Sequence, residues 1–167
     1  MATIVEADGV FQGGGIRGLA LAGALLCFAD HDRLVVRRWV NVAGTSAGAI
    51  VAAYLATDHD PRNLAGLLGE IPYERFQDFG PGGRVAGGAW NLAKYHGLAH
   101  GEYLRNWLDE QLHGATFASV RRDEPVLDKG RDPYRLRLIA SDLTQHRMLV
   151  LAADLARSSR NTRPRPR

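Results

Sequence analysis

Along the first third of the chain, short apolar runs typical of strands alternate with longer segments typical of helices. A short apolar run at residues 5–11 predicts a strand, and residues 39–43 form a second short apolar run. Between them, residues 17–30 are apolar at nearly every position, which predicts a helix buried in a larger fold or packed on a sheet. Apolar residues at helical spacing predict another helix over residues 46–57.

The rest of the chain is less regular but contains further predicted elements. Asp60 followed by Pro61 is typical of a helix start, so a short helix is expected over residues 60–69. Residues 102–113 are amphipathic and predict a longer helix. Two strands are expected at residues 134–140 and 148–152, joined by a turn at residues 144–146.

Residues 71–100 have no clean period and contain many prolines, glycines and aromatic residues. A long irregular segment of this kind is either functional or a simple surface insertion. In the first case its aromatic side chains would suit a cover over an apolar site. The sequence leaves both interpretations open.

The order of strand, helix, strand and helix in the first part indicates an α/β fold. Such alternation predicts a mostly parallel sheet with helices on both faces. Binding sites in these sheets form beyond the carboxyl ends of the strands. Both glycine-rich segments of the chain follow predicted strands, so we expect them to be neighbours in space.

Composition limits the classes of function. The chain has 167 residues and a net charge of +3, and its last eleven residues hold five arginines and no acid. We therefore expect one domain over residues 1–156 and a basic, disordered tail over residues 157–167. The body carries no basic stripe, which argues against nucleic-acid binding.

The single cysteine, Cys27, excludes an internal disulfide and is expected to be a buried, inert thiol. The sequence shows no signal peptide and no apolar run long enough to span a membrane, so a cytoplasmic location is expected.

The segment Gly44-Thr45-Ser46-Ala47-Gly48 has the form G-x-S-x-G between a strand and a helix. This pattern is typical of a nucleophile elbow, in which a tight turn exposes a serine hydroxyl and small residues leave room around it. The following helix would direct its positive end at a developing negative charge. The alternative is a small-residue turn in which Thr45 or Ser46 only caps the helix.

A glycine-rich loop with Gly13, Gly14, Gly15, Arg17 and Gly18 precedes the elbow. Consecutive glycines let backbone N–H groups converge on one oxygen, so the loop suits an oxyanion hole. The same residues fit G-x-G-x-x-G, but no acid follows at the end of the second predicted strand, as a dinucleotide site requires. A nucleotide-binding domain is therefore a weak alternative.

These two segments closely resemble the patatin-like phospholipases. The resemblance rests on Asp8-Gly-Val-Phe-Gln-Gly-Gly-Gly-Ile-Arg-Gly18 and Val42-Ala-Gly-Thr-Ser-Ala-Gly-Ala-Ile50, and it extends over about residues 4–155. It implies a three-layer α/β/α fold with a mostly parallel central sheet. It also implies hydrolysis of ester bonds in phospholipids and other acyl lipids, substrates that allow peripheral contact with a membrane surface.

By this resemblance Ser46 is the nucleophile of a Ser–Asp dyad. Gly13, Gly14 and Gly15 with Arg17 and Gly18 would then form the oxyanion loop. The resemblance implies no histidine in the dyad, no cofactor and no metal. Oligomeric state, substrate head group and acyl length are left open.

The family's aspartate lies in an Asp-Gly-Gly or Asp-Gly-Ala motif well beyond the elbow, and this chain has none there. Its one Asp-Gly, at Asp8, precedes the first glycine loop. Asp142 is expected to be a strand-end or turn acid, and Asp154 a surface or cap residue. No spacing rule selects one of the histidines as a base; the candidates are His59, His96, His100, His113 and His146.

After residue 156 the composition changes abruptly to Arg, Ser and Pro. The sequence thus predicts a C-terminally incomplete, truncated or frame-shifted patatin-like chain with an incomplete catalytic pair. An active hydrolase and a catalytically inactive remnant or lipid-binding module both fit this composition.

Overall fold

A four-stranded sheet organises the larger of two units of the chain. The computed structural model describes residues 2–71, 75, 101–122 and 133–154. Met1–Gly69 and Ala115–Arg167 form the first unit, and Glu70–Gly114 form the second.

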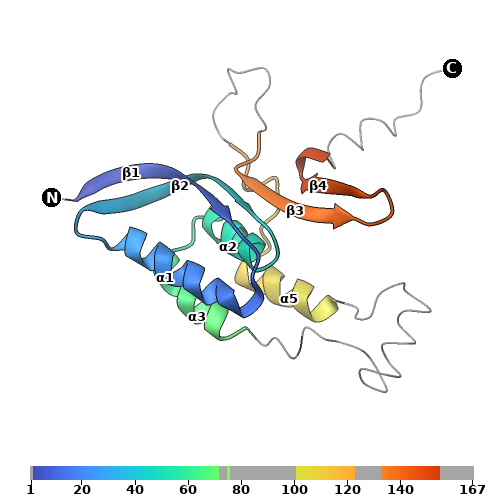
Figure 1. The fold of residues 1–167 in the computed structure, drawn as a ribbon, viewed down its shortest axis with the longest axis horizontal. Helices are drawn as coiled ribbons and strands as arrows, with labels where there is room; N and C mark the ends of the chain where they lie inside the picture. Colours follow the sequence, from blue (N-terminus) through green and yellow to red (C-terminus); the bar gives the residue numbers. More distant parts are fainter. Residues whose placement is uncertain (1, 72–74, 76–100, 123–132, 155–167) are drawn as a thin grey trace. The chain divides into compact units, whose positions relative to one another are not determined.

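The strands lie side by side in their order along the chain (Figure 1). β1 (Thr3–Phe11), β2 (Leu34–Gly44) and β3 (Leu136–Asp142) are parallel, and β4 (Arg147–Leu151) runs antiparallel to β3. The mixed α/β class and the mostly parallel sheet expected from the sequence are therefore confirmed.

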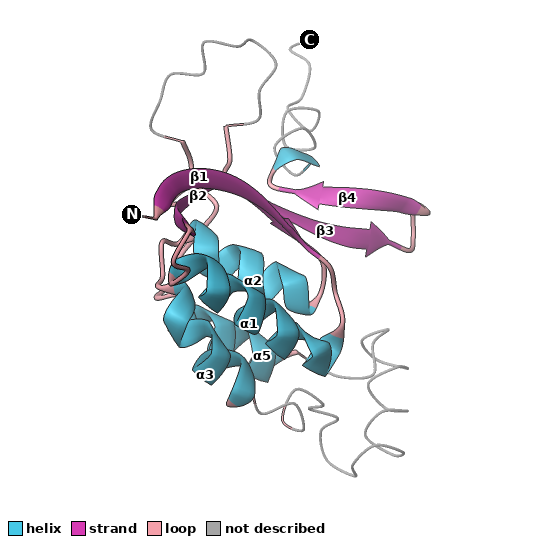
Figure 2. Cartoon of the chain, turned by 60° about the vertical axis from the view of Figure 1, so that its left-hand side comes forward, coloured by secondary structure: helices cyan, strands magenta, loops and turns pink. Residues whose placement is uncertain are grey.

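Three helices of the first unit lie on one face of this sheet, as Figure 2 shows. They are α1 (Gly18–Ala29), α2 (Ala47–Ala56) and α3 (Leu64–Gly69). α2 is buried along almost its whole length. The largest fully buried side chains come from β2, α2 and α3: Val42, Val51, Leu64 and Leu68.

The opposite face of β1 is open in the described part of the chain. Side chains of a strand alternate between faces. Phe11 points to the helices and is buried, whereas Ile4 and Val10 point away and are 64% and 86% exposed. The helices described for this unit thus cover one face only.

α1 buries one narrow face, and the rest of its surface is not buried. Gly18, Ala22 and Leu25 are its buried residues. Of the two placements expected for this helix, packing on a sheet is the one observed. The prediction that Cys27 is buried is wrong, because it lies on the exposed side of α1.

The predicted short helix after α2 is present in two parts, η2 (Pro61–Asn63) and then α3. The Asp60 carboxylate accepts a hydrogen bond from the Arg62 backbone N–H at 2.9 Å, as expected of an N-cap. This hydrogen bond, with a smaller contribution from the Arg62 side chain, lowers the pKa of Asp60 below its usual value.

The other predicted elements are present with shifted ends. β2 begins five residues earlier than the apolar run that predicted it, and β3 and β4 form the expected hairpin. In the second unit, α5 (Glu102–Gln111) matches the predicted amphipathic helix. The predicted tail at residues 157–167 and most of the irregular segment at residues 71–100 lie outside the described residues. None of the described helices is long and apolar enough to cross a membrane.

Candidate active site

The register of β1 and β2 brings the two glycine-rich segments together. Phe11, the last residue of β1, pairs with Gly44, the last residue of β2. The backbone N–H of Thr45 also donates to the Phe11 carbonyl at 3.2 Å. A Cβ built on Gly13 would lie 3.0 Å from the Cβ of Ser46. The two glycine-rich segments therefore lie next to each other, as the sequence predicted.

Ser46 lies in a sharp turn between β2 and α2. Its backbone has φ 49° and ψ −124°, a conformation that non-glycine residues rarely adopt, and α2 begins at the next residue. A strained turn at a strand–helix junction is what a nucleophile elbow requires.

Two glycines make this turn sterically possible. A Cβ on Gly44 would collide with the backbone carbonyl of Gly48, and a Cβ on Gly48 would collide with the carbonyl of Phe11. Neither position leaves room for a side chain. The end of β1, the end of β2 and the start of α2 are therefore packed backbone against backbone.

The hydroxyl of Ser46 is not used to hold the helix. Ser46 is exposed, and its side chain makes no capping hydrogen bond. Thr45 does not cap α2 either, because its Oγ1 accepts a hydrogen bond from the backbone N–H of Gly13 at 2.9 Å. The alternative of a simple capped turn therefore does not describe this junction.

The glycine loop is tied to the elbow through that hydrogen bond. It occupies the N–H of Gly13, and the Gly14 carbonyl accepts from the Arg17 N–H at 3.2 Å to close η1 (Gly15–Arg17). Gly15 has φ 56°, a conformation that favours glycine. Gly18 starts α1, and a Cβ there would lie 3.3 Å from the Cβ of Ala47.

The bridging role of Thr45 is the one feature of this site that the sequence did not indicate. The hydrogen bond joins residues 32 positions apart. No local spacing rule relates Thr45 to Gly13, and only the pairing of β1 with β2 brings them together.

The aspartates considered as bases are engaged in local structure. Asp142 ends β3, and its Oδ1 accepts from the backbone N–H groups of Thr144 and Gln145 at 3.1 and 3.0 Å. Its Oδ2 lies 3.7 Å from Nε of Arg147. Asp142 is thus a turn acid, as expected. Asp154 accepts from the backbone N–H of Val150 in β4 at 2.8 Å, so it binds the end of a strand and not the start of a helix.

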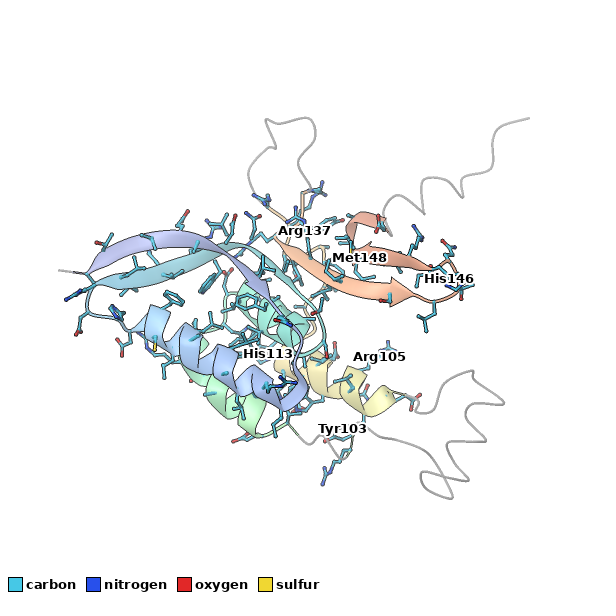
Figure 3. All side chains as sticks on the ribbon, in the orientation of Figure 1. Tyr103, Arg105, His113, Arg137, His146 and Met148 are labelled. Atoms are coloured by element: carbon cyan, nitrogen blue, oxygen red, sulfur yellow. The ribbon has the colours of Figure 1, made fainter. Side chains whose placement is uncertain are left out.

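The histidines do not gather at the elbow within the described chain. His59 follows the far end of α2, where its ring stacks on Tyr54 with centroids 4.6 Å apart. Burial, with a contribution from Asp60, raises the pKa of Tyr54. His146 lies in the turn of the β3–β4 hairpin (Figure 3). His113 belongs to the second unit, and His96 and His100 lie outside the described residues.

The chain matches the family model described as patatin-like phospholipase over residues 9–165. A curated relative, the uncharacterized protein YqhO of Bacillus subtilis (strain 168), is 39% identical over 160 residues, which cover 92% of this chain. The chain spans 50% of that relative's length.

Two solved structures are also similar. The type III effector protein ExoU is 20% identical with a TM-score of 0.49, and the match covers 91% of this chain and 37% of that one. VipD from Legionella pneumophila is 15% identical with a TM-score of 0.49, and the match covers 90% of this chain and 40% of that one.

Proposed function

Because the chain belongs to the patatin-like phospholipase family, we propose that it is the nucleophile-bearing part of a lipid acyl hydrolase, with Ser46 as the attacking residue. The observation that carries this proposal is the backbone of Ser46, held at φ 49° between glycines that admit no side chain. A strained residue with an exposed hydroxyl, free of any capping bond, is what covalent catalysis requires.

In the proposed reaction, Oγ of Ser46 attacks the carbonyl carbon of an acyl ester. The hydroxyl proton passes to a base, the ester oxygen leaves as an alcohol, and water then hydrolyses the acyl-enzyme. The negative charge that develops on the carbonyl oxygen needs donors already in position. The backbone N–H groups of Gly14 and Gly15 suit this role, because that of Gly13 is occupied by Thr45.

The proposal does not assign the base that accepts the Ser46 proton to any of these 167 residues. By family resemblance it is an aspartate followed by glycine, and none follows Ser46 in the sequence. Asp142 is already bound by two backbone N–H groups. We propose that the aspartate is supplied by polypeptide beyond these 167 residues, which agrees with the half-length match to the curated relative.

Labelling with a fluorophosphonate probe tests the nucleophile. We expect slow labelling of the 167-residue chain, lost completely in Ser46→Ala and retained in Ser141→Ala, an exposed serine on β3 that serves as the matched control. Labelling that persists in Ser46→Ala would place the reactive group elsewhere and end the proposal.

A lipid-binding module without turnover is the second candidate, favoured by the missing aspartate. Hydrolysis of a short-chain aryl ester separates the two. Removal of a catalytic base costs several orders of magnitude, so we expect turnover of this chain to be very weak. Robust turnover abolished by Ser46→Ala would instead reveal a base within the chain.

A further inference from the structure

A hollow lies on the first unit at the end of α2 away from Ser46. Its volume is about 390 Å³, and it is lined by Glu6, Arg38, Val40, Asp58, Ser119, Arg121, Arg122 and Arg135. Among these described residues are four guanidinium groups and two carboxylates. The arginines are scattered along the sequence, and the fold brings them into one place.

Arg135 is the fixed part of this hollow. Its side chain is only 8% exposed, and it forms a bidentate pair with the Asp58 carboxylate at 3.0 and 2.9 Å. It also donates to the backbone carbonyl of Trp39 at 2.8 Å. Nε of Arg135 is buried and has no hydrogen-bond partner among the described residues.

The charges that remain are positive. Because Asp58 balances Arg135, Glu6 is the carboxylate that remains among the described lining residues, and it faces Arg38 and Arg121. Glu6 stands opposite Arg38 in the pairing of β1 with β2. Even so, within the described chain neither Arg38 nor Arg121 has a carboxylate at ion-pair distance.

We propose that the hollow lined by Arg38, Arg121 and Arg135 binds a phosphate group. Guanidinium groups bind phosphate oxygens through charge-assisted hydrogen bonds, and Arg38 and Arg121 have no carboxylate at ion-pair distance within the described chain. α2 separates this hollow from Ser46, and its ten residues span about 15 Å. The phosphate site is thus distinct from the ester-cleaving site and does not depend on it.

Calorimetric titration with inorganic phosphate at low ionic strength tests the proposal. We expect saturable binding to the 167-residue chain, weakened about tenfold in Arg38→Ala and in Arg121→Ala. Both side chains are exposed, so neither change empties the core. Arg33→Ala is the matched control, because it removes one exposed positive charge of the same unit outside the hollow and should leave the affinity within about twofold.

Vesicles identify the source of the phosphate. Phosphatidylcholine vesicles with and without phosphatidic acid are sedimented with the protein. Binding that requires phosphatidic acid and is displaced by inorganic phosphate supports a lipid head group as the ligand. Phosphate binding without vesicle binding supports a soluble phosphate ester. Absence of phosphate binding, or equal weakening by Arg33→Ala, overturns the proposal.

Discussion

Different interactions hold the chain at the two ends of α2. At its amino end, Ser46 is held by contacts between backbones that leave no space for a Cβ on Gly44 or Gly48. Past its carboxyl end, Asp58 is held by the charged side chain of Arg135. The first arrangement depends on shape and the second on charge. The two ends should therefore respond differently to mutation, salt and added methyl groups.

The largest effect is expected from a single methyl group at the elbow. Gly48→Ala forces a Cβ against the Phe11 carbonyl and should lower the free energy of unfolding by about 3 kcal/mol. In Gly23→Ala, the control, the new Cβ meets nothing within 4 Å on helix α1. That change should raise stability by about 1 kcal/mol. Urea denaturation measures both, and equal effects would contradict the contrast.

A smaller loss is expected at the charged end. Asp58→Asn removes the charge that balances buried Arg135 while keeping a residue that tolerates φ 58°. We expect unfolding to become easier by about 1–3 kcal/mol. Asp32→Asn, an exposed acid in the turn before β2, should change stability by less than about 0.5 kcal/mol. A loss in Asp58→Asn no greater than that of the control would show that the pair contributes nothing.

The smallest effect concerns the hydrogen bond between Gly13 and Thr45. Thr45→Val keeps the shape of the side chain but removes the acceptor of the Gly13 N–H. A net hydrogen bond contributes about 1 kcal/mol, so the labelling rate of Ser46 should fall about fivefold. Thr45→Ser restores an acceptor and should recover most of that rate. Failure of the serine variant to recover would mean that packing, not the hydrogen bond, positions the loop.

The same contrast explains what the sequence could predict. The elbow and the glycine loop are local patterns, so Ser46, Gly44 and Gly48 could be identified from their neighbours. The strand pairing that places them together followed from the alternation of strands and helices. The start of β2 was missed because Arg37 and Arg38 interrupt its apolar pattern.

Features that depend on distant contacts were not predictable in this way. The Arg135–Asp58 pair joins residues 77 positions apart, and nothing near either residue indicates the other. Cys27 was expected to be buried because its own segment is apolar. Burial of that segment depends on which face α1 turns to its neighbours, and the neighbours contact only the stripe of Gly18, Ala22 and Leu25.

The contacts of Arg135 bear on the order in which the chain folds during synthesis. Its side chain donates to the Trp39 carbonyl, 96 positions earlier in the sequence, and to Asp58, 77 positions earlier. β1, α1, β2 and α2 can therefore assemble on the ribosome while one side of β2 is still unpaired, and that side closes only after β3 emerges. Contacts this distant in sequence form late and slowly. The nascent chain then carries an exposed strand edge while residues 45–135 are translated, and such an edge can pair with other chains.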